Sequence, residues 1–248
     1  MRSLRVLLTA CGCPGASTLI RMLKGVRERK IEIIGVDMDN QAIGRFLADG
    51  FFQVPPASSP DYIPRMLELV EELRPDVVFP ESSVEVPVLA KYRHEFERRG
   101  AVVLVSDPEA IETASDKFLM YEVLRELTEI PLPGYRLVTT MDEFLRAVEE
   151  LGYPERPVCF KPPVAKGSRG FRILDASVDR KDLLLNYKPN SRYMSLDEFV
   201  HIFRDDPDFP KLLVMEYLEG EECTTDPIAL HGEMLLCMAK TVEAARWG

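Results

Sequence analysis

Lysine, glycine and arginine gather in one short stretch near the middle of the chain. It begins at Lys161 and ends in the run Gly167, Ser168, Arg169 and Gly170. Glycines adopt backbone conformations closed to other residues, so several amide N–H groups can turn toward one point. Such amides, with lysine, serine and arginine side chains around them, make a cradle for an anion, and a phosphate group is the ligand we expect. The alternative is a hairpin loop whose charges are only solvated.

Lys117 is a second basic candidate, at the start of a helix predicted over 115–127. It follows Asp116, a residue type that caps helix starts. Helix starts favour anions, and a lysine there adds a mobile positive charge at the same end. An ordinary exposed lysine in a first helical turn is the competing interpretation.

A third candidate is the acidic turn after the strand predicted over 212–217. A strand that leaves its sheet frees backbone N–H and C=O groups, which can pair with a purine ring, while a carboxylate can accept hydrogen bonds from ribose hydroxyls. An acidic solvated turn explains the same pattern. The residues concerned are Met215, Glu216, Tyr217, Leu218 and Glu222.

Two weaker signals lie earlier in the chain. The run Gly12–Gly15 follows the first predicted strand, and Asp37 follows the second, as in dinucleotide-binding proteins. However, the full G-x-G-x-x-G spacing is absent and Pro14 removes an amide donor, so a tight turn is the better interpretation. Glu81 follows Pro80 at the end of the strand predicted over Asp76–Phe79, where α/β sheets place their ligands, although it could equally cap a helix.

The elements that position the early candidates alternate between strand and helix. Apolar runs of strand length are separated by segments with helical spacing, which predicts βαβ units and a doubly wound parallel sheet. We therefore expect an α/β protein whose residues 1–113 form a Rossmann-like domain. The predicted strands are Leu4–Ala10, Ile31–Val36, Asp76–Phe79 and Val102–Val105, and the predicted helices are Leu19–Arg29, a short one near Gln41–Ala48, Tyr62–Leu73 and Val84–Arg98.

The second part of the chain has an α+β pattern with antiparallel pairs. A helical linker over 114–134 leads to a lid-like region over 135–216, and residues 217–248 begin a further subdomain. Two capping boxes, Thr140–Glu143 and Ser195–Glu198, each predict a helix start. Further strands are expected at Tyr135–Val138, Pro157–Lys161, Phe171–Asp175 and Leu212–Tyr217, and a hairpin at Cys223–Leu230 and Glu233–Ala239.

Composition excludes several classes of protein. The 248 residues carry a formal net charge of −10, which disfavours nucleic-acid binding as the main role. Five cysteines without a CxxC pair argue against a zinc site and fit a reduced cytoplasm. The apolar start is too short for a signal peptide, and no apolar run is long enough to span a bilayer.

The candidates are individually weak, but their order along the chain is informative. A Rossmann-like domain, Ser115-Asp-Lys117, a strand ending in Lys161, a Gly-Ser-Arg-Gly loop and a strand entering Glu216–Glu222 resemble, in that order, the ATP-grasp superfamily. The likeness is strongest to proteins related to the carbamoyl-phosphate synthase large chain, and it covers nearly the whole chain.

The resemblance implies a role for each matching position. Lys117 and Lys161 would contact ATP phosphates, and Gly167–Gly170 would close over them. Met215 and Leu218 would meet adenine through their backbone, with Glu216 and Tyr217 alongside, and Glu222 would hold ribose. Lys161, Arg169, Asp226 and Lys240 would serve the reaction near the γ-phosphate, and Glu81 would contact the substrate.

The resemblance also implies the chemistry. A carboxylate would attack the γ-phosphate of ATP to give an acyl phosphate, which an amine would then capture, with Mg²⁺ and lysines stabilising the charge. The partners would be a small-molecule carboxylate and an amine, with no nucleic acid and no membrane, and a homodimer is left open. No counterpart of the family's metal ligands is found, and we expect them beyond residue 248, so we interpret the chain as a fragment.

Two rival functions remain open from the sequence. A non-catalytic nucleotide-binding or regulatory module would use the same phosphate cradle without the metal ligands. An NAD-linked enzyme would use the turn after the first strand instead, and its cofactor binding would not depend on Lys161.

Overall fold

The computed structural model describes residues 2–127, 129–165, 167, 169–186, 192–204 and 206–241. The chain forms two compact units, Met1–Met120 and Tyr121–Gly248, each described here by itself.

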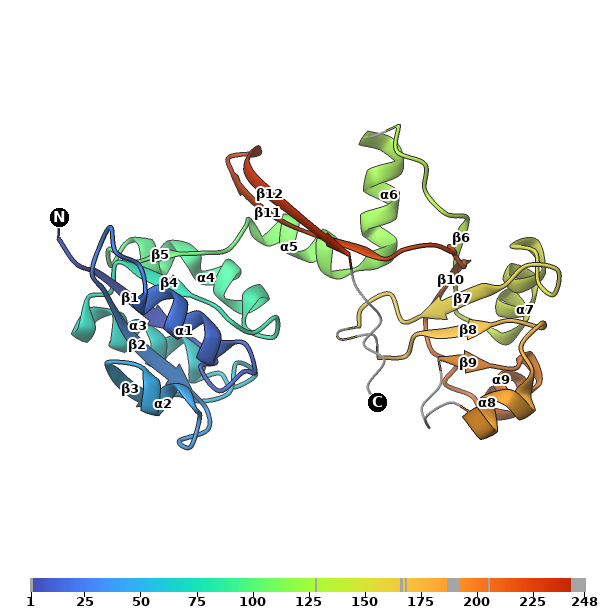
Figure 1. Ribbon diagram of the computed structural model, residues 1–248, viewed down its shortest axis with the longest axis horizontal. Helices are drawn as coiled ribbons and strands as arrows, with labels where there is room; N and C mark the ends of the chain where they lie inside the picture. Colours follow the sequence, from blue (N-terminus) through green and yellow to red (C-terminus); the bar gives the residue numbers. More distant parts are fainter. Residues whose placement is uncertain are drawn as a thin grey trace. The chain divides into compact units, whose positions relative to one another are not determined.

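The first unit is built on a parallel five-stranded sheet with the strand order β3-β2-β1-β4-β5 (Figure 1). The chain starts at the centre of this sheet, builds outward through β2 and β3, and returns to the other side with β4. The strands are β1 (Leu4–Leu8), β2 (Ile31–Asp37), β3 (Gly50–Gln53), β4 (Val77–Phe79) and β5 (Val102–Val103).

Helices cover both faces of this sheet, because the buried strands alternate their side chains between two cores. Leu7 packs into a core with α3 and α4, whereas Leu8 faces a second core with α1. The helices are α1 (Ala16–Lys24), α2 (Gly44–Leu47), α3 (Tyr62–Leu73), α4 (Val86–Glu97) and α5 (Pro108–Ser115). The result is the doubly wound α/β arrangement that the sequence predicts.

Helix α6 (Lys117–Leu127) follows, and the boundary between the two units falls within it, between Met120 and Tyr121. The second unit contains a mixed five-stranded sheet with the order β6-β10-β7-β8-β9. Its strands are β6 (Tyr135–Val138), β7 (Val158–Lys161), β8 (Arg172–Leu174), β9 (Tyr193–Met194) and β10 (Leu212–Glu216), and its helices are α7 (Met141–Glu150), α8 (Arg180–Asn186) and α9 (Leu196–Phe203).

An aromatic cluster holds α7 and α9 against one face of this second sheet. The rings of Phe144 on α7 and Phe199 on α9 stack with centroids 3.9 Å apart, and Phe160 of β7 meets both edge-on. All three side chains are buried. Aromatic pairs of this kind add to the free energy gained from burying their area, so the cluster fixes which face of β7 points inward.

Both predicted capping residues are confirmed. The Thr140 hydroxyl accepts from the Glu143 amide at 3.2 Å, and the Ser195 hydroxyl accepts from the Glu198 amide at 3.1 Å. In the reciprocal half of the first capping box the Glu143 carboxylate accepts from the backbone of both Thr139 and Thr140, whereas in the second box Glu198 pairs with Arg180.

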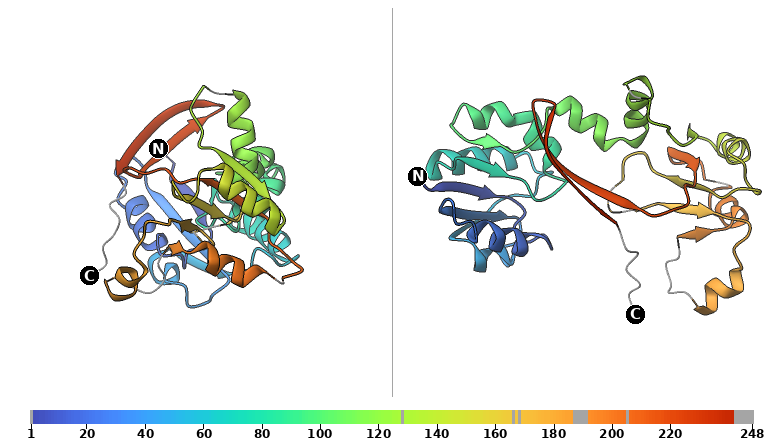
Figure 2. Two further views of the ribbon diagram at one scale, coloured as in Figure 1. Left: turned by 90° about the vertical axis from the view of Figure 1, so that its right-hand side faces the viewer. Right: turned by 45° about the horizontal axis from the view of Figure 1, so that its top comes forward.

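The predicted hairpin is confirmed as β11 (Cys223–Leu230) and β12 (Glu233–Thr241), joined by a turn in which His231 and Gly232 have positive φ (Figure 2). It forms a separate two-stranded sheet, and its described residues are almost all exposed.

Other boundaries differ from the predictions. The first helix runs from Ala16 to Lys24 and not from Leu19 to Arg29, because Gly25 ends it. Strand β3 and helices α5 and α8 were not anticipated, since none has the length or the regular apolar spacing of a strong sequence signal. The polar stretch before Tyr193 lies largely outside the described residues. In the part of the chain that the structure describes, no helix combines the length and apolar character needed to cross a bilayer.

The contact of Gly44 with the turn after β1 gives a test of the first unit. A Cβ at Gly44 would lie 2.5 Å from Cys11 Cβ and 2.7 Å from its carbonyl oxygen, whereas a Cβ at Gly50 meets nothing closer than 3.9 Å. We expect Gly44→Ala to lower the free energy of unfolding by about 1–3 kcal/mol through overpacking. Urea unfolding followed by circular dichroism measures this, with Gly50→Ala as the matched control. Equal stability of the two variants would contradict the packing described.

Candidate functional site

Lys161 lies at the end of β7, on the face of the second sheet opposite the aromatic core. Side chains alternate along the strand, so Val158 and Phe160 pack into that core while Cys159 and Lys161 point the other way. The neighbouring strand β10 pairs Leu213 with Lys161 and Met215 with Cys159. The face that carries Lys161 therefore also carries these side chains.

This second face of the sheet is apolar and buried beside the lysine. Cys159, Ile173, Leu213 and Met215 are each at most 5% exposed. Burial raises the pKa of the Cys159 thiol to about 11, while the charge of Lys161 acts to lower it. The positive charge of Lys161 thus acts electrostatically on Cys159, a member of the apolar patch.

Tyr135 of β6, which pairs with Met215, continues this face of the sheet, and Tyr121 of α6 packs on it. Their rings stack with centroids 5.0 Å apart, and the Tyr135 hydroxyl donates to Glu122 at 2.7 Å. Burial, followed by the proximity of Cys159, raises the pKa of Tyr121. Within the second unit, Tyr121 of α6 therefore lies against the face that bears Lys161.

The loop after Lys161 bends at two glycines. Gly167 and Gly170 have φ of +60° and +75°, a region that other residues rarely adopt. At Gly170 a Cβ would also lie 2.6 Å from Pro162 Cδ, so the loop closes tightly on its own start. Arg169 is exposed between them, and Ser168 lies outside the described residues.

Glu216 ends β10 with its side chain on the core side of the sheet, because it pairs with Val158. Its carboxylate accepts from the Gly134 amide at 2.7 Å and lies 3.8 Å from Arg156. Its carbonyl oxygen is 3.7 Å from the Cys159 sulfur. Only the backbone of Glu216 therefore faces the Lys161 side, while its carboxylate secures the start of β6.

The segment after β10 leaves the sheet as the sequence suggests. Tyr217 makes one long backbone contact, 3.4 Å from its nitrogen to the Pro157 oxygen, and Leu218 is 67% exposed. Glu222 is exposed just before β11. Across the hairpin, Lys240 donates to Asp226 at 2.7 Å, and both side chains are exposed.

In the first unit, Lys117 occupies the first position of α6. The Asp116 carboxylate accepts from the amides of Phe118 and Leu119 at 2.8 and 3.2 Å, which confirms it as the cap. An anion at this helix start would meet that carboxylate, so Lys117 would have to bind it through its side chain.

Glu81, also in the first unit, lies against the turn that precedes α1. A Cβ at Gly15 would lie 2.6 Å from Glu81 Oε1, so the carboxylate fills the space beside that helix start. Burial raises the pKa of Glu81. A dinucleotide pyrophosphate would need this same position, which argues against the NAD-linked alternative.

Glu85 is a polar residue that sequence reasoning missed. It is 8% exposed, and its carboxylate accepts from the hydroxyls of Thr9 and Tyr62, the latter at 3.0 Å. Burial raises its pKa, whereas the two hydroxyl donors act to lower it. The sequence places Glu85 within the predicted helix Val84–Arg98, and only the fold reveals that its side chain is buried beside the end of β1.

Among the described residues, no three His, Cys, Asp or Glu side chains come together in an arrangement that could hold a metal ion.

Comparison with known proteins places this geometry in context. Residues 6–104 match the family model described as the PylC-like N-terminal domain. The carbamoyl phosphate synthase large chain of Rubrobacter xylanophilus is 36% identical over 114 residues, which is 46% of this chain and 10% of the relative. That of Clostridium acetobutylicum is 27% identical over 175 residues, 71% of this chain and 14% of the relative. An alignment of that length is longer than either unit and includes residues of both.

A solved structure shares the fold. N5-carboxyaminoimidazole synthetase from Staphylococcus aureus, complexed with ADP, superposes with a TM-score of 0.57 at 13% identity, covering 91% of this chain and 50% of that chain. This chain thus spans about half the length of that structure and a small part of each curated relative.

The contacts of Glu216 lead to a prediction about stability. We expect Glu216→Ala to lower the free energy of unfolding by about 1 kcal/mol, because the part-buried Gly134 amide loses its acceptor. Glu219→Ala, at an exposed position three residues on, should leave it unchanged. Urea unfolding of both variants measures the difference, and equal midpoints would refute a structural role for the Glu216 carboxylate.

Proposed function

Because this chain belongs to the ATP-grasp superfamily, we propose that it is the ATP-binding part of an ATP-dependent carboxylate–amine ligase. One observation carries the proposal. Lys161 leaves β7 beside a buried apolar patch and leads directly into a loop bent by Gly167 and Gly170. A nucleotide needs this combination, an apolar surface for its base next to cationic groups for its phosphates.

Lys161 and the loop over 162–170 supply the phosphate end of the proposed site. Two unit charges about 4 Å apart interact by about 4 kcal/mol at an effective dielectric constant near 20. The half-buried position of Lys161 supports a stronger interaction than a fully exposed lysine would make. Arg169, and Ser168 outside the described residues, would complete the cradle as the loop closes.

The segment from Met215 to Glu222 supplies the nucleoside end. The backbone of Leu218 would pair with the edge of adenine. Met215, whose backbone is paired within the sheet, would instead meet the adenine ring as part of the apolar patch beside Cys159. Glu216 and Tyr217 would contribute backbone only, since the carboxylate of Glu216 is held by Gly134. Glu222 is exposed and available to accept from ribose hydroxyls.

The reaction we propose proceeds in two displacements. A substrate carboxylate oxygen attacks the γ-phosphorus, the bond to the bridging oxygen breaks, and ADP leaves with that electron pair. An amine then attacks the acyl carbon, phosphate leaves, and the amine loses a proton to solvent. Lys161 and Arg169 would stabilise the charge that develops on the transferred phosphate.

The resemblance assigns the remaining roles. Asp226 and Lys240 would lie near the γ-phosphate, and their ion pair holds the two strands of the hairpin in register at that point. Lys117 would reach a phosphate, and Glu81 would contact a substrate from the first unit. Magnesium would neutralise the phosphates, but none of the described residues fits it as a ligand set, so we derive no step through it.

Calorimetric titration of Mg·ATP into the chain tests the proposal. We expect saturable binding that Lys161→Met weakens at least about tenfold, because a cation beside an apolar patch is lost, and that Glu222→Ala weakens less. Lys181→Met on α8 is the matched control for a lost lysine.

Two results would count against this function. If Lys161→Met leaves the affinity for Mg·ATP unchanged, the nucleotide does not bind beside β7. If the folded chain does not bind Mg·ATP, the proposed nucleotide-binding function is wrong. If ATP binds, ADP release in the presence of carboxylates and amines separates a ligase from a binding module.

A further inference from the structure

A cavity of about 740 Å³ opens in the first unit at the carboxyl ends of its central strands. Its walls come from the turns that follow β1, β2, β3 and β4, and the strand order reverses between β1 and β4. Doubly wound sheets bind ligands at this point, and the volume is that of an ordinary small-molecule site. The described residues of this unit form it without a contribution from the second unit.

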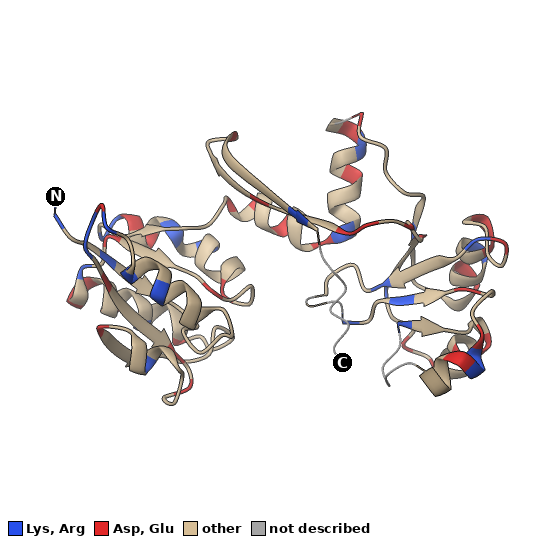
Figure 3. Cartoon of the chain, in the orientation of Figure 1, with Lys and Arg blue, Asp and Glu red and all other residues tan. Residues whose placement is uncertain are grey.

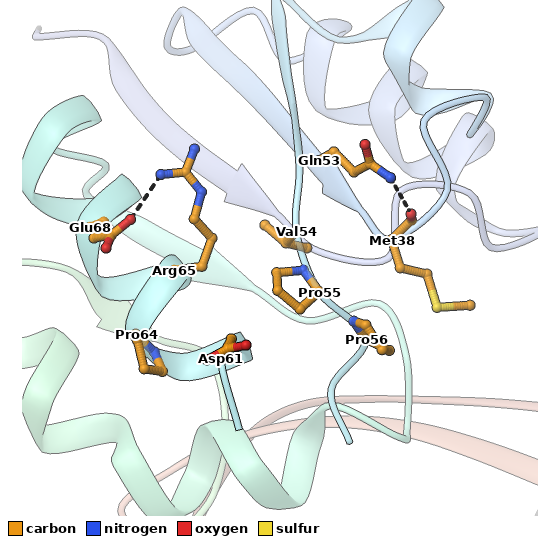
Figure 4. A pocket seen from close by; sticks show the side chains of 9 residues that line it. All are labelled: Met38, Gln53, Val54, Pro55, Pro56, Asp61, Pro64, Arg65 and Glu68. Carbon is orange, nitrogen blue, oxygen red and sulfur yellow. Dashed lines mark hydrogen bonds and ion pairs between the residues drawn. The ribbon is translucent and has the colours of Figure 1, made fainter. Parts of the chain in front are cut away.

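The walls of the cavity are largely apolar and uncovered. Met38, Ile43 and Val84 are 63%, 48% and 59% exposed, although all three line the same cavity. Pro55 and Pro56 form a rigid wall beside them, which also borders a neighbouring hollow (Figure 4). A compact apolar ligand would cover these side chains, and each buried CH₂ contributes about 0.8 kcal/mol.

The polar groups of the cavity are acidic. The Asp37 carboxylate is 9% exposed and is held by the amides of Gly12 and Asp39, both at 2.8 Å. Asp39 is exposed at the rim, and Glu85 is buried between Thr9 and Tyr62. Cys13 lines the same cavity, and burial followed by the charges of Asp37, Glu81 and Glu85 raises the pKa of its thiol.

Basic groups do not line this cavity. All of residues 2–120 are described, and no Lys or Arg of that range is among the lining residues. Three basic residues, Arg27, Arg29 and Lys30, lie in the loop after α1, and the other basic residues of this range are spread over the unit outside the cavity lining (Figure 3). A phosphate or carboxylate ligand would therefore enter the cavity without a counter-charge.

We propose that this cavity binds a small organic cation, a primary ammonium group on a compact apolar body. The ammonium would lie against Asp39 and the carboxylates of Asp37 and Glu85, and its apolar body would cover Met38, Ile43 and Val84. The site is independent of the nucleotide site on β7. Its use as the amine substrate site would in addition require the ligase function proposed above.

The test is a titration followed by two-dimensional amide NMR on the full chain. The probes share one ring and differ in charge: cyclohexylammonium, cyclohexanol and cyclohexanecarboxylate. We expect saturable shifts for the ammonium alone, confined to residues 10–14, 37–43, 55–58 and 82–85.

Three variants make the test specific. Asp39→Asn, which keeps an acceptor for the Gln41 amide, should lower the affinity for cyclohexylammonium about threefold, since it removes a negative charge at the rim of the cavity. Glu85→Gln should lower this affinity further. If Glu85→Gln does not fold, Asp39→Asn alone tests the proposal. Glu72→Gln, an exposed change on α3, should have no effect.

Any of three results overturns the proposal. The first is an equal or larger response to the alcohol or the carboxylate, which would make the cavity merely apolar or anion-binding. The second is a shift pattern outside the named segments. The third is unchanged affinity in both Asp39→Asn and Glu85→Gln. Because no nucleotide is present, each result is read separately from the ATP titration.

Discussion

Alternation along β7 is the constraint on which the second unit depends. Val158 and Phe160 must enter the aromatic core under α7 and α9, and this places Cys159 and Lys161 on the opposite face. A slip of one residue against β10 would push the ammonium group into the stacked rings of Phe144 and Phe199. The packing of the core therefore positions the cation, and the loop bent by Gly170 begins where the strand ends.

In the first unit, close packing also determines which groups surround the turn after β1. Its turn after β1 packs so closely on α2 that Gly44 has no room for a Cβ, and the carboxylates of Glu81, Asp37 and Glu85 surround that turn. The Glu81 carboxylate lies beside Gly15 at the start of α1, where a dinucleotide fold would hold the phosphates. A Rossmann-like framework is thus combined with a local concentration of acidic side chains, which is why we propose the phosphate site in the second unit.

The sequence is sufficient to predict the framework and the strand on which Lys161 lies. Long amphipathic segments such as Tyr62–Leu73 and the caps at Thr140 and Ser195 have local signals, and the structure confirms them. Short elements such as β3 have too few residues to show a period. The direction of the Glu216 carboxylate and the burial of Glu85 depend on neighbours far apart in the chain, Gly134 and Thr9, which no local pattern specifies.

Photolabelling with 8-azido-ATP, followed by mass spectrometry of the digested chain, tests most directly whether the nucleotide lies on the face of Lys161. The account predicts labelled peptides from 158–161 or 212–222, and loss of label when excess ATP competes. Label in segments 10–14 or 37–43 of the first unit, or label that ATP does not displace, would contradict it.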